Sequence, residues 1–109
     1  MPNHLLDSTF HALADPTRRA ILSRLAAGEE SAGALAEPFD MALPSFLQHL
    51  KVLEAGGLIT TEKRGRQRIC RLEEARFAEA RGWMEAEMRR WTGRLDRLGD
   101  YLNRKDRPQ

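Results

Sequence analysis

Residues 43–55 constrain the fold most, because they form a segment with two contrasting sides. At the helical rotation of about 100° per residue, one side collects five apolar residues, Leu43, Phe46, Leu47, Leu50 and Leu53. The opposite side carries Ser45, Gln48 and Val52, flanked by His49 and Lys51. Pro44 suits the first turn of such a helix, and the pair Gly56 and Gly57 suits its exit. The segment therefore predicts a helix that packs through one side and presents a polar side to a partner.

Three shorter helices are predicted before this segment. Residues 3–13 carry apolar residues at helical spacing. Asp15 can cap a second helix, and Pro16 suits its first turn. A third helix of about two turns starts at the capping residue Ser31 and ends near Pro38, because the residue before a proline avoids the helical region.

A hairpin and a long helix are predicted after it. Residues 58–64 and 68–72 favour two short strands, and Gly65 between them can take the positive φ of a tight turn. Residues 73–102 predict a long helix with a coiled-coil-like seam. The seam residues, at alternating spacings of four and three, are Met84, Met88, Trp91, Leu95, Leu98 and Leu102. Residues 103–109 are polar and predict a frayed tail.

The order of these elements predicts a mainly α fold, a winged helix-turn-helix. It would contain four helices, a two-stranded β-hairpin wing and a long C-terminal dimerisation helix over residues 73–102. A chain of 109 residues has the usual size of one domain, which we expect to occupy residues 1–102. With 41% hydrophobic residues, the chain is apolar enough to form a core.

The predicted hairpin is strongly basic. Positions 60–72 hold five basic residues and one acidic residue, although the formal net charge of the whole chain is only +2. A local excess of this kind indicates a polyanionic partner. The residues expected to lie along a DNA duplex, on phosphates or in the minor groove, are Lys63, Arg64, Arg66 and Arg68.

The two-sided helix fits the same partner. The major groove of double-stranded DNA accepts one helix, whose early side chains reach base edges while the preceding helix braces it. We therefore expect Ser45, Gln48 and His49 to contact bases. Lys51 is expected to meet a phosphate.

Two runs of residues resemble the ArsR family of bacterial winged-helix transcriptional regulators. They are residues 10–22, FHALADPTRRAIL, and residues 50–59, LKVLEAGGLI. The resemblance implies a homodimeric, usually repressing regulator whose first and last helices form the dimer interface. The interface residues expected on this basis are Leu6, Phe10, Met84, Met88, Trp91, Leu95, Leu98 and Leu102.

The metal sites of such regulators are not expected in this chain. Metal-sensing members of the family carry paired cysteines on the short helix, or a His and carboxylate set on the last helix. Residues 31–37 contain no Cys and residues 76–102 contain no His. The sequence identifies no effector and no cofactor.

The function expected from these features is sequence-specific binding of a near-palindromic operator by a homodimeric repressor. An alternative is a winged-helix module that binds proteins instead of DNA, because a fold does not establish a function. An enzyme is not expected, because no Ser, His and carboxylate set and no phosphate-binding loop is present. The lone Cys70 fits a reducing cytoplasm, and no apolar run approaches the roughly 20 residues of a membrane span.

Three groups of residues leave alternatives open at this stage. His4, Asp7 and His11 form either a solvated helix face or part of a zinc site. Cys70 is either a small buried residue or a redox-active thiol with a pKa lowered by neighbouring arginines. Met84, Met88 and Trp91 form either the dimer seam or the lining of an effector pocket.

The pair Arg18 and Arg19 also has two interpretations. These residues either touch DNA or form a structural ion pair, for which Glu54 is a candidate partner.

Overall fold

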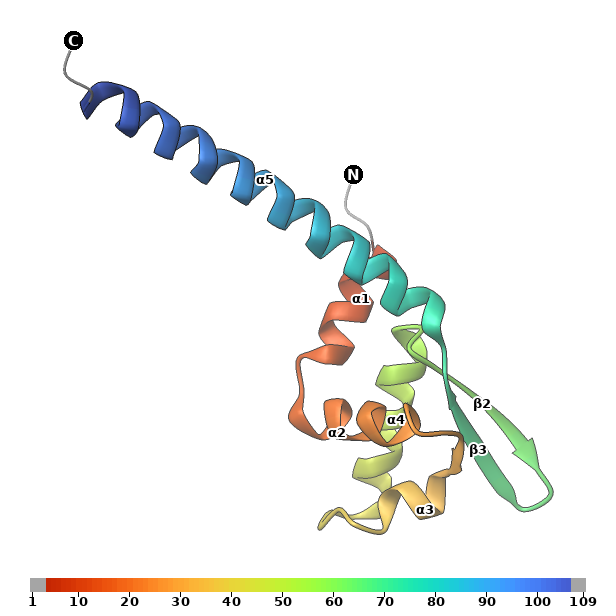
Figure 1. Cartoon of the computed structure of the whole chain (residues 1–109). Coiled ribbons are helices and arrows are strands. Elements are labelled where there is room, and N and C mark those ends of the chain that lie inside the picture. Colours follow the sequence, from red (N-terminus) through yellow and green to blue (C-terminus); the bar gives the residue numbers. More distant parts are fainter. Residues whose placement is uncertain (1–3, 107–109) are drawn as a thin grey trace.

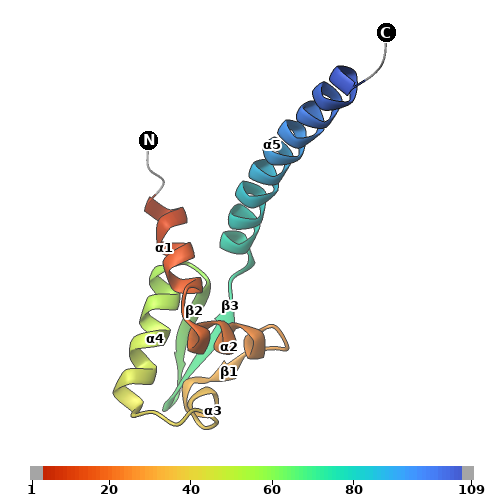
Figure 2. The same cartoon turned by 90° about the vertical axis from the view of Figure 1, so that its left-hand side faces the viewer.

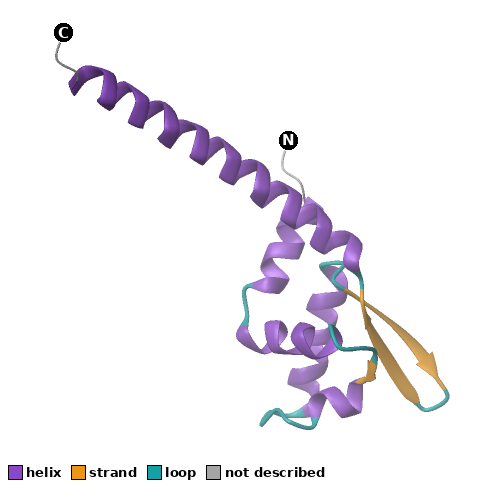
Figure 3. Ribbon diagram, viewed as in Figure 1, coloured by secondary structure: helices purple, strands orange, loops and turns teal. Residues whose placement is uncertain are grey.

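The computed structural model describes residues 4–106. Its elements are α1 (His4–Leu13), α2 (Pro16–Leu25), β1 (Glu30–Ser31), α3 (Ala32–Ala36), α4 (Leu43–Ala55), β2 (Ile59–Arg64), β3 (Gln67–Leu72) and α5 (Glu74–Asp106). The four shorter helices pack beside the hairpin, whereas α5 crosses one end of this group and continues far beyond it (Figures 1 and 3). The longest dimension of the molecule is therefore 78 Å, against 30 and 22 Å for the other two.

Capping side chains set the starts of the helices that hold α4. Asp15 accepts a hydrogen bond from the backbone N–H of Arg18, and Pro16 is the first residue of α2. Ser31 accepts from the backbone N–H of Ala34 at the start of α3. Both caps agree with the sequence prediction. By contrast, Ala42 gives α4 no side-chain cap.

The hairpin has the predicted tight turn. Arg64 pairs with Gln67, which leaves a two-residue loop of Gly65 and Arg66. Gly65 has a φ of 62°, a conformation that a residue with a side chain rarely adopts. The second strand therefore begins at Gln67, one residue before the predicted start.

The sheet contains a third strand that the sequence pattern does not predict. The two residues of β1 pair antiparallel with β3, Glu30 with Cys70 and Ser31 with Ile69, so that the strand order is β1-β3-β2. Two residues are too few to show an alternating pattern in a sequence. The predicted two-stranded hairpin is present, and β1 extends it to a three-stranded sheet.

The core lies between the helices and the inner face of the sheet. Its largest fully buried side chains include Ile21, Leu35, Phe46, Leu53 and Leu58. Burial of each such side chain contributes about 1.5–3 kcal/mol. The inward side of α4 is therefore held by α2, α3 and the hairpin, and its orientation is fixed by the packing.

The C-terminal end of the chain differs from the prediction. The long helix continues to Asp106, so residues 103–106 belong to α5 and not to a frayed tail. Basic residues in this last turn, Arg104 and Lys105, favour a helix C-terminus. Residues 107–109 of the predicted tail, and Asn3 at the start of the first predicted helix, lie outside the described residues.

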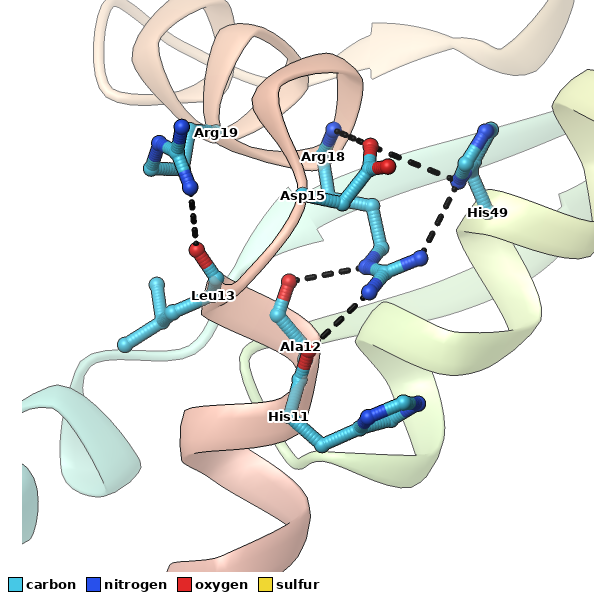
Figure 4. A network of polar contacts seen from close by, with 7 residues as sticks. All are labelled: His11, Ala12, Leu13, Asp15, Arg18, Arg19 and His49. Atoms are coloured by element: carbon cyan, nitrogen blue, oxygen red, sulfur yellow. Dashed lines mark hydrogen bonds and ion pairs between the residues drawn. The ribbon is translucent and has the colours of Figure 1, made fainter.

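Arg18 connects three helices through its buried side chain (Figure 4). Its Nε donates to the carbonyl oxygen of Ala12 at 2.8 Å, and its Nη2 donates to that of His11 at 2.9 Å. Its Nη1 lies 3.2 Å from Nδ1 of His49 on α4. The guanidinium therefore satisfies carbonyls at the C-terminal end of α1, which the helix itself cannot pair.

The carboxylate of Asp15 belongs to the same network. Its Oδ2 accepts the backbone N–H of Arg18 at 3.0 Å and lies 3.8 Å from Nδ1 of His49. The hydrogen bond from the backbone N–H of Arg18 holds the pKa of Asp15 below its usual value. The stabilisation from this cap is therefore complete above the usual pKa and is lost as the pH falls through the lowered one.

The ion pair suggested between Arg18 and Glu54 is wrong. Arg18 bonds to α1 and to His49, and Glu54 instead accepts a hydrogen bond from Thr61. Arg19 is exposed and donates to the carbonyl oxygen of Leu13 (Figure 4). Sequence spacing could not separate the two arginines, which differ in burial because they project from different sides of α2.

We expect Arg18→Met to lower the free energy of unfolding by about 2–4 kcal/mol, because it leaves the buried carbonyl oxygen of Ala12 without its donor and removes the bond to His49. Arg19→Met is the matched control, and its loss should stay below about 1 kcal/mol because water replaces its exposed bond. Urea unfolding followed by circular dichroism at one fixed protein concentration measures both variants. Equal losses would contradict the structural role of Arg18.

Candidate nucleic-acid interface

The exposed side of α4 and the hairpin lie at the same end of the domain. Figures 1 and 2 both show the N-terminal end of α4 and the tip of the hairpin pointing away from the projecting half of α5. The two elements diverge from the short turn that joins α4 to β2. A surface with a protruding helix and a flanking hairpin therefore faces solvent at this end.

The polar residues of α4 are arranged largely as the sequence indicated. Ser45, Gln48 and Lys51 are exposed, and no hydrogen bond within the described residues engages their side chains. Phe46, Leu50 and Leu53 are buried on the opposite side. The helix thus offers a hydroxyl, an amide and an ammonium group to a partner.

His49 has a different environment from these three residues. Its side chain is only 22% exposed, because it lies against Asp15 and Arg18 at the start of α2. Since an arginine can only donate, Nδ1 of His49 must accept, and the neutral ring then carries its proton on Nε2. His49 therefore braces α4 against α2 through one nitrogen and keeps a donor on the other.

Two leucines of α4 are not packed as expected. Leu43 is 55% exposed and Leu47 is 37% exposed, although the helical pattern places both on the inward side. Leu43 is the first residue of the helix and lies beyond the core, and Leu47 lies at the margin of the buried side. Val52, which the pattern places on the outward side, is instead half-buried against the core. The helical rotation alone does not show how wide the buried side is.

The four basic residues of the wing differ in their partners. Arg64 donates to Glu62 and to Glu29, whose Oε1 lies 2.8 Å from Nη1. The hydrogen bond from Arg64 lowers the pKa of Glu29, and the two carboxylates raise the pKa of Arg64. Much of the positive charge of Arg64 is therefore balanced within the protein. The sequence could not show this, because Glu29 is 35 residues away.

The other three basic residues of the wing form no ion pair with a carboxylate among the described residues. Arg68 donates from Nη1 to the hydroxyl of Thr61 at 2.8 Å, which is a neutral partner. Lys63 and Arg66 are exposed, and they form no ion pair with any side chain that the structure describes. Three cations thus remain available to a polyanion along the hairpin.

The residues expected at the dimer interface lie on α1 and along one side of α5. Most of the α5 stripe is exposed, including Met88 at 68%, Trp91 at 61% and Leu95 at 62%. Phe10 of α1 already packs edge-to-face with Trp83 of the same chain, with ring centroids 5.6 Å apart. The sequence stripe did not include Trp83, because it lies beside the seam. A large apolar surface therefore remains open on this helix.

Cys70 is a core residue. Its side chain is fully buried beneath the sheet, and this burial raises the pKa of the thiol. A thiol with a raised pKa is a poor nucleophile, so the interpretation as a reactive thiol with a lowered pKa is wrong.

The zinc alternative gains no support on α1. Asp7 and His11 are exposed, and no group of three or more potential ligands occurs among the side chains that the structure describes. The side chain of His4 lies outside that set. Separately, no helix in the described part of the chain has the length and apolarity needed to cross a membrane.

Comparison with known proteins places these features in a family. A family model for a helix-turn-helix domain matches residues 13–62, from the end of α1 into β2. The chain is 38% identical over 89 residues to the HTH-type transcriptional regulator Rv2034 of Mycobacterium tuberculosis. This alignment covers 82% of this chain and 80% of that protein. The chain is 33% identical over 79 residues to the transcriptional repressor SdpR of Bacillus subtilis, with coverages of 72% and 88%.

Solved structures agree with this assignment. The crystal structure of the ArsR family transcriptional regulator RHA00566 superposes with a TM-score of 0.80 at 44% identity, covering 84% of this chain and 95% of that one. The solution structure of the homodimeric winged helix-turn-helix DNA-binding domain of Mb0332 from Mycobacterium bovis gives a TM-score of 0.63 at 26% identity, with coverages of 77% and 79%. The predicted fold class is confirmed, and the chain belongs to the ArsR family of winged helix-turn-helix transcriptional regulators.

Proposed function

We propose that this protein is a homodimeric repressor that binds a near-palindromic operator in double-stranded DNA and acts in the cytoplasm, without catalytic activity. The observation that carries the proposal is the surface at which the polar side of α4 and the basic hairpin meet solvent together. A major groove accepts one helix, and a flanking hairpin can then reach the adjacent backbone. A repressor of this kind acts by occupying its operator.

In this proposal α4 is the recognition helix. Gln48 can form two hydrogen bonds with an adenine, and Ser45 can donate to several base edges. His49 would contribute its Nε2 donor, and Lys51 a phosphate contact. The exposed Leu47 adds an apolar surface that suits the methyl group of thymine.

The wing would supply affinity more than sequence choice. Lys63, Arg66 and Arg68 neutralise phosphates in this arrangement, which releases counterions and makes binding depend steeply on salt. Arg64 contributes less, because Glu29 and Glu62 already pair with it.

The dimer would form through α1 and α5. Monomeric proteins rarely expose an apolar stripe as long as the one on α5. A second copy of the chain carries the same stripe, so a twofold dimer would bury the two stripes against each other. A twofold dimer would hold two recognition helices about one helical turn, or about 34 Å, apart. Leu6 and Phe10 extend the proposed interface onto α1.

Selection of bound duplexes from a random pool provides the operator for the test of DNA binding. Gln48→Ala should then relax the preference at one base pair, with a loss of about 1–3 kcal/mol of discrimination.

Arg66→Ala combined with Arg68→Ala should weaken binding to operator and random DNA alike and should lower the salt slope by about 0.9 for each lost phosphate contact. Fluorescence anisotropy at several salt concentrations measures both effects.

Arg104→Ala is the control for the wing variant, because it removes the same kind of charge at the far end of α5. It should leave the salt slope nearly unchanged. If the wild-type protein shows no salt-dependent binding to any duplex, the protein is instead a winged-helix module for protein interaction.

Leu98→Glu tests the proposed dimer. The variant places a charge in the apolar seam of both copies, and we expect the dissociation constant of the dimer to rise at least about 100-fold. Sedimentation velocity over a concentration series measures the constant. Arg89→Glu, on the polar side of the same helix, should remain as dimeric as the wild type. A Leu98→Glu variant with unchanged association would exclude α5 from the interface.

A further inference from the structure

A short chain of hydrogen bonds connects α4 to both strands of the hairpin. Nη1 of Arg68 on β3 donates to Oγ1 of Thr61 on β2 at 2.8 Å. Oγ1 of Thr61 in turn donates to Oε2 of Glu54, in the last turn of α4, at 2.7 Å. We call this arrangement the Glu54–Thr61–Arg68 relay. It links the proposed recognition helix with the proposed wing.

Each member of the relay has a fixed role. The hydroxyl of Thr61 has a single hydrogen, which it gives to the carboxylate, and its lone pair then accepts from the guanidinium. Arg68 can only donate and an ionised Glu54 can only accept, so the direction of the chain cannot reverse. Hydrogen bonds in series also polarise one another, which strengthens each of them.

The relay orients Arg68 without neutralising it. Thr61 is uncharged, and the other guanidinium nitrogens of Arg68 have no hydrogen bond within the described residues. Arg64 shows the contrasting case, because carboxylates occupy its guanidinium directly. Arg68 is therefore held in place while its charge and four of its five donors remain available.

The position of the relay connects it with binding. It borders a hollow of about 300 Å³ between α4 and the hairpin, which Leu47 and Lys51 also line. Two cations, Lys51 of α4 and Arg68 of β3, thus line one recess on the surface proposed to bind DNA. Whatever fixes Arg68 relative to α4 also fixes its position relative to the helix that carries Lys51.

We propose that Thr61 is a positioning residue, which aims Arg68 at a backbone phosphate and fixes the wing relative to the recognition helix. The inference rests on the proposed DNA-binding function and adds a residue to it. Without the hydroxyl, the flexible arginine side chain would have to become ordered during binding, which reduces affinity.

The test is a double-mutant cycle on the full-length protein with the selected operator duplex. Thr61→Val keeps the shape and strand propensity of the side chain but removes the hydroxyl, and it should weaken operator binding about 3- to 10-fold. Thr61→Ser keeps the hydroxyl and should restore most of the affinity. In an Arg68→Ala background, Thr61→Val should have almost no further effect, because the group that it positions is gone.

The cycle distinguishes the positioning of Arg68 from electrostatic repulsion between Glu54 and DNA. Repulsion by an uncovered Glu54 carboxylate would persist in the Arg68→Ala background, and additive losses would therefore overturn the positioning role. A Thr61→Val variant that binds as well as the wild type would overturn it too. Thermal unfolding checks that the variants are folded, and Thr60→Val, on the other face of β2, is the control for the strand. If the wild type binds no duplex, the proposed function itself fails, whatever the cycle shows.

Discussion

The arrangement of the helices depends on the buried guanidinium of Arg18. A buried charge of this kind is tolerated only when hydrogen bonds satisfy it, and here the acceptors come from the end of α1 and from His49 on α4. Asp15 adds a carboxylate next to the same histidine. Because these acceptors belong to different helices, α1 and α4 cannot shift independently without leaving a donor unpaired. α1, one of the two helices proposed for the dimer interface, is thereby tied directly to α4, the helix proposed for DNA recognition.

This link between α1 and α4 matters because the chain exposes two surfaces that each suit a partner. The half of α5 that projects beyond the other helices (Figure 1) carries a long exposed apolar stripe. The opposite end of the domain carries exposed polar and basic side chains. A second copy would cover the first surface and duplex DNA the second. The distance between two recognition helices in such a dimer depends on how rigidly each α4 is attached to its own α1 and α5. Arg18, together with the packing of Phe10 on Trp83, supplies that attachment.

Most of the fold could be predicted because it depends on interactions between neighbours in the sequence. Pairings between residues distant in the sequence could not be predicted. Asp15 and Ser31 cap helices through their own neighbours, and Gly65 sets the turn alone, so the sequence was sufficient for them. The strand β1, the pairing of Arg64 with Glu29 and the network of Arg18 each join residues distant in the chain. For the candidate site, helical rotation identified the outward Ser45, Gln48 and Lys51. It misjudged Leu47, because the width of the buried side depends on the neighbouring hairpin.

The charge of the wing shows why a count of basic residues is a coarse measure of DNA binding. Two arginines at neighbouring positions of the hairpin have opposite roles, because Arg64 meets carboxylates and Arg68 meets a hydroxyl. An ion pair keeps a guanidinium ordered but balances its field, whereas a neutral partner orders it and leaves the field intact. The second arrangement is the one that favours a phosphate contact at fixed geometry. Thr61, an uncharged residue, therefore accounts for part of the electrostatic character of this surface.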